Sequence, residues 1–270
     1  MNNCLLCLAR RRLLAGAVSV AGLSLLPRVW AARREVLLNL EDAQWSPIGE
    51  RNRRKQLSID SETGGQTFYM EIPSNWRGGG VAHYHTCSEE VYVLSGDVTL
   101  NGRDYLEDGA YLYRPAGIVH GHREGSIGGC RLIIKTNSTL DFNYVPEPTS
   151  DEEYVLVPSQ DGRPHILHLK TPEVGWTWRA EGKGRHGIKL LNEDLDTGAY
   201  SALLRLPTGW AGVFEMPADA TWEWFVIAGA AVLGDGTPLT AESYGIRPAG
   251  GSGQAIVRAQ QDTQLLLWRD

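Results

Sequence analysis

The sequence has few cysteines, no apolar stretch long enough to cross a bilayer and no long helical period. Only four of its 270 residues are cysteine. The apolar run LLAGAVSVAGLSLL, at residues 13–26, has 14 residues, whereas a membrane-spanning helix needs about 20. These shortages argue against a disulfide scaffold, a transmembrane protein and a helical bundle.

The short apolar run lies in a segment typical of a cleaved export signal. A basic start, MNNCLLCLARRR, precedes the run, and the small residues Ala31 and Ala32 follow it. The stretch from Arg10 to Leu14 resembles the twin-arginine export motif. We interpret residues 1–32 as a twin-arginine signal peptide and expect a periplasmic protein. A general secretory signal or an N-terminal anchor is the alternative.

Cleavage would remove four arginines and no acidic residue, which takes the formal net charge from −6 to −10. A mature protein this acidic is a poor binder of nucleic acid or of anionic membranes, so we expect neither as a partner. Only Cys87 and Cys130 would remain. They could pair in an oxidising compartment, although two buried free thiols are the simpler interpretation.

The chain contains an internal repeat at a shift of 133 to 134 residues. TGGQTFYMEIPSNW at 63–76 aligns with TGAYSALLRLPTGW at 197–210, and EEVYVLSG at 89–96 aligns with WEWFVIAG at 222–229. YRPAG at 113–117 aligns with IRPAG at 246–250. A shared offset over several blocks indicates two copies of one structural unit.

Each copy is built from short β-branched and aromatic segments separated by Gly, Pro, Asn and Asp. Strand–turn–strand patterns without intervening helical patterns predict an all-β barrel or sandwich. The stretch from Ser138 to Pro164 is rich in Pro, Asp, Glu and Ser and is the natural connection between the copies. We therefore predict a first domain at 33–150 and a second at 151–270.

The stretch HYHTCSEEVYVLSG, at 83–96, predicts a metal site in the first copy. His83 and His85 share one face of a strand because side chains alternate. A turn can bring Glu89 to the same side, and His120 follows a second turn at Pro115. Three imidazoles and one carboxylate suit Fe, Mn, Ni, Cu or Zn and leave positions for exogenous ligands.

These residues resemble the two motifs of the cupin superfamily. The pattern HxHxxxExxxxxxG is filled by His83, His85, Glu89 and Gly96, and GxxxxxPxGxxH is filled by Gly109, Pro115, Gly117 and His120. The asparagine that often follows the second motif is replaced by Glu124. The two-copy layout is similar to the bicupins, which implies two jelly-roll barrels in tandem. It also resembles uncharacterised proteins related to the cupin domain of zinc-binding anti-sigma factors of the ChrR type.

The second copy lacks all four predicted ligands. Its equivalent positions hold Met216, Ala218, Trp222 and Gly253, whose side chains cannot hold a metal, so we expect one metal per chain. The aromatic residues of this copy are Trp210, Trp222, Trp224 and Phe225. They either fill the vacated space or line an apolar ligand pocket, and filling is the simpler interpretation.

We expect an exported metal-binding bicupin, a metal-dependent oxygenase or related enzyme acting on a small organic molecule. A non-catalytic metal or ligand-binding protein, such as a sensor or store, is the alternative, because superfamily membership does not fix the reaction. The first hypothesis requires a further acid, base or cation at the site. Tyrosines near the motifs and Arg114 are candidates, whereas Glu90 should face the other way, toward solvent or the domain contact.

The predicted export route affects which metal the protein acquires. A twin-arginine substrate folds before it crosses the membrane, so the metal would be selected in the cytoplasm. We therefore favour Fe or Mn, with Zn, Ni and Cu as alternatives, since intrinsic affinities favour copper and zinc. We expect a monomer or a homodimer, because the two copies of a bicupin already pack as a dimer of single domains would.

Overall fold

The computed structural model describes residues 35–251 and 253–270, and its regular structure is almost entirely β-strand. The only helices of these residues are two single 3₁₀ turns, η1 (Leu40–Asp42) and η2 (Thr171–Glu173). Within the same ranges no helix is long and apolar enough to span a membrane. The predicted signal peptide, residues 1–32, lies outside the described residues.

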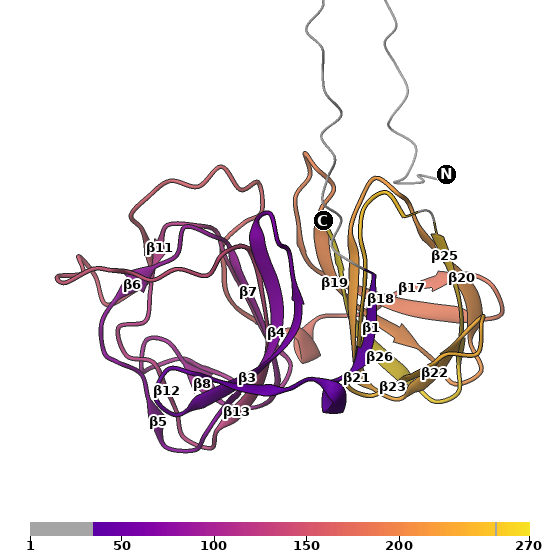
Figure 1. Cartoon of the computed structure of the whole chain (residues 1–270), viewed down its shortest axis with the longest axis horizontal. Helices are drawn as coiled ribbons and strands as arrows, with labels where there is room; N and C mark the ends of the chain where they lie inside the picture. Colours follow the sequence, from indigo (N-terminus) through magenta and orange to yellow (C-terminus); the bar gives the residue numbers. More distant parts are fainter. Residues whose placement is uncertain (1–34, 252) are drawn as a thin grey trace, which may run out of the picture. The chain divides into compact units, whose positions relative to one another are not determined.

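Two antiparallel seven-stranded sheets dominate the fold, one in each half of the chain (Figure 1). The first large sheet has the strand order β16 (Ile166–Lys170), β10 (Ala110–Arg114), β7 (Glu89–Gly96), β13 (Cys130–Ser138), β4 (Gly64–Ile72), β3 (Asn52–Ile59), β2 (Trp45–Ile48). The second large sheet has the order β1 (Val36–Asn39), β24 (Ser243–Arg247), β21 (Trp222–Ala228), β26 (Thr263–Arg269), β19 (Tyr200–Leu206), β18 (Arg185–Glu193), β17 (Thr177–Ala180).

Smaller sheets complete each half. In the first half they are β5 (Trp76–Arg77), β12 (Gly125–Ser126), β8 (Val98–Thr99) and β9 (Tyr105–Leu106), β6 (His83–Tyr84) with β14 (Asn143–Tyr144), and β11 (Ile118–Val119) with β15 (Tyr154–Val155). In the second half they are β20 (Ala211–Met216), β25 (Gly253–Ala259), β22 (Ala230–Leu233) and β23 (Pro238–Thr240). Each half has an apolar core of its own. The predicted all-β architecture of two jelly-roll barrels is confirmed.

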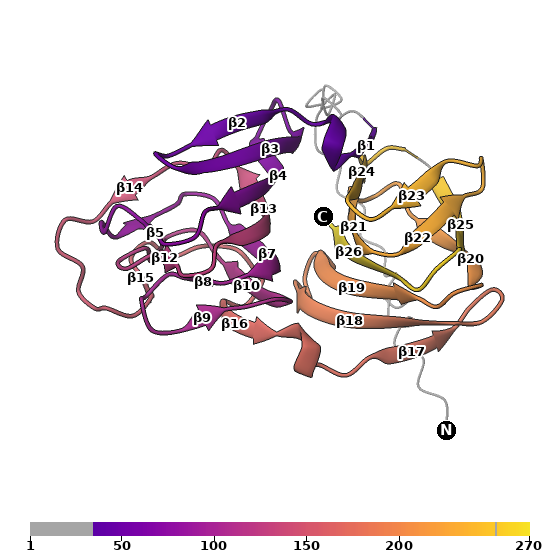
Figure 2. The ribbon, with the colours of Figure 1, turned by 90° about the horizontal axis from the view of Figure 1, so that it is seen from below.

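The strand orders of the two large sheets confirm the internal repeat. Each strand of the series β10, β7, β13, β4, β3, β2 has its counterpart in the series β24, β21, β26, β19, β18, β17. The outermost strands are exchanged between the halves. Strand β1 pairs with β24 of the second sheet, and β16 pairs with β10 of the first (Figure 2). Each barrel therefore includes one strand from the other half of the sequence.

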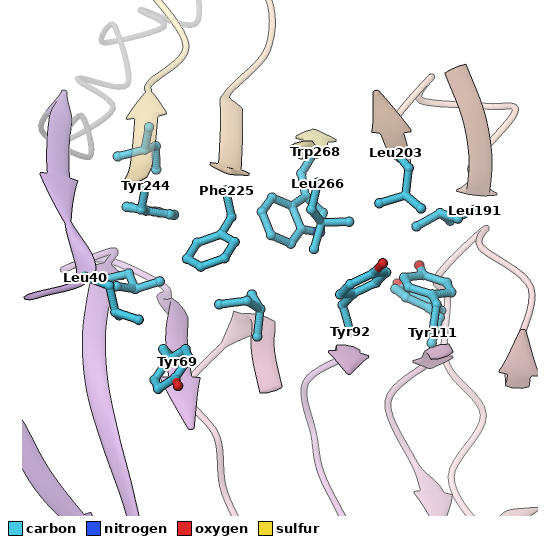
Figure 3. Close-up of a cluster of buried hydrophobic side chains, with 14 residues drawn as sticks. Leu40, Tyr69, Tyr92, Tyr111, Leu191, Leu203, Phe225, Tyr244, Leu266 and Trp268 are labelled. Carbon is cyan, nitrogen blue, oxygen red and sulfur yellow. The ribbon is translucent and has the colours of Figure 1, made fainter. Parts of the chain in front are cut away.

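The two large sheets share a third apolar core. Val91 and Val93 of β7 point into the first barrel, so by alternation Tyr92 points to the opposite face. There it joins a cluster of 14 buried residues drawn from both halves, in which Tyr69, Tyr92 and Tyr111 face Phe225 and Trp268 (Figure 3). The strands of these sheets are consequently buried on both faces.

Two buried glutamates one repeat apart satisfy polar groups in this shared core. Glu90 accepts hydrogen bonds from Trp268 Nε1 at 2.6 Å and from Arg163 Nη1 at 3.2 Å. Glu223 accepts from the hydroxyl of Thr67 at 2.8 Å and pairs with Lys135. The expectation that Glu90 turns away from the predicted ligands is confirmed, and its environment is the contact between the barrels.

Candidate metal centre

The structure brings three of the predicted ligands together inside the first barrel. His83 lies on β6 and His120 follows β11, and the two backbones exchange hydrogen bonds of 2.9 Å in both directions. The carbonyl of His85 accepts from the Gly117 amide at 2.8 Å, which ties the first motif to the turn of the second. One ring nitrogen from each histidine lies within 4.8 Å of the others.

The second ring nitrogen of each histidine is already engaged. His120 Nδ1 lies 3.0 Å from the Ile118 carbonyl, His83 Nδ1 lies 3.3 Å from the Val81 carbonyl, and His85 Nδ1 bonds the Asp141 carbonyl. A carbonyl can only accept, so each Nδ1 carries the proton and each Nε2 keeps its lone pair. This arrangement orients histidine ligands in metalloproteins.

Burial favours the neutral form of His83 and His120. All three histidines are at most 6% exposed. Burial lowers the pKa of His83, and burial followed by the charge of Arg114 lowers the pKa of His120 well below its ordinary value. Neutral imidazoles are the form that binds metal. The donor set therefore fits a divalent transition metal.

The fourth predicted ligand, Glu89, lies beside the histidines but is paired with an arginine. Glu89 Oε2 is 3.8 Å from His120 Nε2 and accepts a hydrogen bond of 2.8 Å from Arg114 Nη1. Glu89 is not within the 4.8 Å group that the imidazoles form. Its participation as a ligand stays a prediction.

The connecting segment supplies groups that the motifs do not reveal. Arg114, 3% exposed, makes three further contacts of 2.7 to 3.0 Å with Glu153, and Glu153 Oε2 lies 2.9 Å from His165 Nε2. Burial would raise the pKa of Glu153, but Arg114 and His165 lower it to about 2. Glu153 lies 64 residues after Glu89 in the sequence, so no local spacing could have identified it.

The same segment covers the histidines with aromatic rings. Strand β14 pairs with β6, and the ring of Phe142 lies 5.1 Å from the rings of both His83 and His85. Tyr144 stacks on Phe142 with ring centroids 6.4 Å apart. Phe142 and Tyr144 are 49% and 65% exposed. The segment predicted as a connection is thus also a wall of the site.

Glu124, which replaces the asparagine of the second motif, borders the site from another side. A Cβ placed on Gly121 would lie 3.2 Å from Glu124 Oε1 and 2.8 Å from His83 Nδ1, so the carboxyl and the imidazole flank the same small space. Burial, followed by the charge of Glu89, raises the pKa of Glu124 to about 7. It is therefore a protonatable group beside the predicted ligands.

Three of the tyrosines near the motifs lie away from the site. Tyr92, Tyr111 and Tyr113 belong to the shared core between the barrels, because they alternate with residues that point into the first barrel. Arg114 alone of the candidates on β7 and β10 faces the site. His122 is partly buried and lines a different pocket.

The second barrel keeps the backbone of the site without its donors. Met216 pairs with Gly253, as His83 pairs with His120 in the first barrel. A Cβ on Gly253 would collide with the guanidinium of Arg247, which occupies that space. Met216 and Trp222 pack together, and Trp210 lies in the barrel's apolar core. These side chains fill the region, although Phe225 belongs to the shared core instead.

The comparisons with known proteins agree with this architecture. Residues 33–140 match the model of the ChrR cupin-like domain family. A candidate dioxygenase from Nostoc punctiforme superposes with a TM-score of 0.70 at 16% identity, covering 88% of this chain and 83% of its own. Oxalate decarboxylase from Bacillus subtilis superposes at 0.56 and 14% identity, covering 87% and 76%. No curated protein matches the sequence.

One matched protein is described as a dioxygenase and the other as a decarboxylase. At 16% and 14% sequence identity, the likeness to each shows the fold alone. The family match covers the half that contains the convergent histidines. The structural matches extend over both barrels. Residues 33–140 therefore match the ChrR cupin-like domain family, and the two barrels together have the fold of the matched structures.

Proposed function

We propose that the protein is a metal-dependent enzyme, an oxygenase that acts on a small organic molecule in the first barrel. The observation that carries this proposal is the convergence of His83, His85 and His120, each with Nδ1 bonded to a carbonyl. A transition metal bound there would supply Lewis-acid or redox chemistry and leave positions for exogenous ligands. Iron and manganese are the proposed metals. A Mn(II) centre has been described in the structurally similar oxalate decarboxylase of Bacillus subtilis.

Glu124 provides the acid–base group that an enzyme needs beyond its ligands. A carboxyl with a pKa of about 7 exchanges protons readily at neutral pH. Because Glu124 and His83 flank the same space, the carboxyl oxygen can hold or release a proton next to the metal's ligands. In this role Glu124 accepts the proton of a weakly acidic substrate.

The aromatic wall and the local charge favour a planar, weakly acidic substrate. Phe142 and Tyr144 present half-exposed rings beside the imidazoles. Glu153 neutralises Arg114, and Glu89 contributes one negative charge. With a divalent metal the group carries about one net positive charge. An enolate or phenolate matches both the flat apolar surface and this charge.

The test combines metal analysis with oxygen uptake. We expect about one equivalent of iron or manganese in protein from its own host, and none in a His83→Ala/His85→Ala variant. Loaded protein should then consume oxygen with a member of a panel of small diketones and phenols. Iron or manganese without oxygen uptake across the panel would count against the oxygenase.

A non-catalytic sensor or store is the second candidate function, and the match to the ChrR cupin-like family favours it. Zinc is redox-inert, so it cannot support oxygenase chemistry. One tightly held equivalent of zinc in the native protein, with no exchangeable water in the metal's coordination shell, would replace the first proposal with this one.

We also propose that residues 1–32 direct folded protein to the periplasm through the twin-arginine route. The arginines at 10–12 and the apolar run after them support this proposal. Arg11→Lys/Arg12→Lys should hold the precursor in the cytoplasm, as judged by cell fractionation. Unchanged secretion of this variant, or of wild type in a host without the twin-arginine system, would refute the route.

A further inference from the structure

A continuous chain of charged groups runs from the predicted ligand Glu89 to the segment that connects the barrels. Arg114 pairs with Glu89 on one side and Glu153 on the other, and Glu153 contacts His165. The side chains of Arg114, Glu89 and Glu153 are at most 12% exposed. Because little water reaches them, each charge depends on its neighbours in the chain.

Arg114 divides its hydrogen bonds unequally between the two carboxylates. Its Nε lies 3.0 Å from both oxygens of Glu153, and its Nη2 lies 2.7 Å from Oε1. Toward Glu89 it offers only Nη1, which reaches Oε2 at 2.8 Å. Bidentate pairing is the stronger of the two arrangements. Glu153 therefore takes the larger share of the guanidinium.

The unequal division has a consequence for Glu89. A guanidinium has five N–H donors and stays charged. Without the Glu153 carboxylate, Glu89 would be the remaining partner of the buried Arg114 among these charged groups. Arg114 would then attract Glu89 more strongly. A carboxylate that pairs strongly with arginine is a weaker metal ligand, because its negative charge is shared between the guanidinium and the metal.

We propose that Glu153 is a positioning residue for the metal centre, which engages Arg114 and so leaves Glu89 available to the metal. The segment between the barrels, which carries Glu153 and ends next to His165, thereby becomes part of what sets metal affinity. This inference rests on the proposed metal-binding function. It goes beyond that function by assigning a role to residues outside both motifs.

The test measures Co²⁺ affinity and the visible Co²⁺ spectrum, with chelator competition and no turnover assay. Glu153→Gln should weaken Co²⁺ binding by about 10-fold to 100-fold, as is usual for groups that support a ligand. The spectrum should also change, because Glu89 withdraws. Glu152→Gln is the matched control. It removes the same charge one residue away, from a side chain that is 62% exposed, and should leave affinity and spectrum unchanged.

A double-mutant cycle separates positioning from a general charge effect. In a Glu89→Gln background, Glu153→Gln should change Co²⁺ affinity by about twofold or less, because the group through which it acts is gone. An equal loss in both backgrounds would overturn the inference. Absence of Co²⁺ binding by the wild type would instead overturn the proposed function.

His165→Ala provides a second variant if Glu153→Gln does not fold. His165 is partly exposed, so its removal is better tolerated, and it releases the outer side of Glu153. The variant should tighten Co²⁺ binding by a small factor, because Glu153 then serves Arg114 alone. It should lose that effect in the Glu89→Gln background. Wild-type affinity in a folded His165→Ala protein would overturn the role of the segment.

Discussion

Substitutions of His85 and of Met216 test whether the first copy alone binds metal. His85→Ala removes one of three convergent imidazoles, and we expect metal content to fall from about one equivalent to a small fraction. Met216→Ala alters the position equivalent to His83 in an apolar cluster and should leave metal content unchanged. Elemental analysis of both purified proteins decides the matter. Equal metal loss in both would contradict a single site in the first barrel.

The raised pKa of Glu124 predicts that the stability of the metal-free protein depends on pH. Its pKa rises from 4.5 to about 7 on folding, so the folded state holds the proton more tightly than the unfolded chain. The free energy of unfolding should therefore fall as pH rises from about 4.5 to about 7, by up to about 3 kcal/mol. Glu124→Gln removes this contribution. Relative to wild type, the variant should gain stability across the same interval.

Chemical denaturation at pH 4.5, 6 and 8 in the presence of chelator measures this difference. Glu152→Gln serves as the control, since that carboxyl is exposed. His83 and His120 add a slope of opposite sign in wild type and variant alike, because their lowered pKa values favour the folded state as pH rises. Parallel stability curves for wild type and Glu124→Gln would show that the carboxyl does not titrate as stated.

At the scale of elements, the turn that ends β7 needs a glycine for two reasons. Gly96 has a φ of +88°, and a Cβ there would collide with the carbonyl of Gly129 on the neighbouring turn. Gly80 also has a positive φ, +69°, but its Cβ would meet nothing within 4 Å. Gly96→Ala should therefore destabilise the protein far more than Gly80→Ala does.

We expect about 1 to 2 kcal/mol for Gly80→Ala, the usual cost of a left-handed residue. Gly96→Ala should exceed about 4 kcal/mol or prevent folding, because two backbone segments must separate. Urea unfolding of the two variants measures the difference. Similar midpoints would show that the turn of β7 relaxes without disturbing β13. The equivalent Gly229 of the second copy should behave like Gly96, since its Cβ would meet the carbonyl of Asp262.

At the scale of the molecule, the exchanged strands make each barrel depend on the other half of the chain. A fragment of residues 33–150 lacks β16, the edge strand of its own large sheet. It also exposes Tyr69, Tyr92 and Tyr111, which the second barrel covers. We expect this fragment to self-associate and to unfold at a lower temperature than the whole chain.

Light scattering and thermal unfolding of the fragment test this dependence. A fragment of residues 33–175, which restores β16 and η2, is the matched comparison. It should unfold at a higher temperature than 33–150 but still self-associate, because the aromatic face remains uncovered. A monomeric 33–150 fragment as stable as the whole chain would show that the shared core contributes little.

Local patterns in the sequence determined much of this protein. The offset of 133 to 134 residues establishes two copies. Strand alternation places His83 and His85 on one face, and the turn at Pro115 together with the resemblance to the second cupin motif adds His120. The loss of donors at Met216 and Gly253 follows from the same alignment. Glu124 was visible as a departure from the second motif, although its raised pKa depends on burial that spacing does not report.

Tertiary structure decided what depends on distant segments. Strands β1 and β16 exchange because the two large sheets face each other, which no local propensity encodes. The same contact buries Tyr92 and Tyr111 and removes them from the site. Glu153 reaches Arg114 only because the connecting segment folds back over the first barrel. Electrostatic interactions depend on the distance between groups in space, whereas a sequence gives only their distance along the chain.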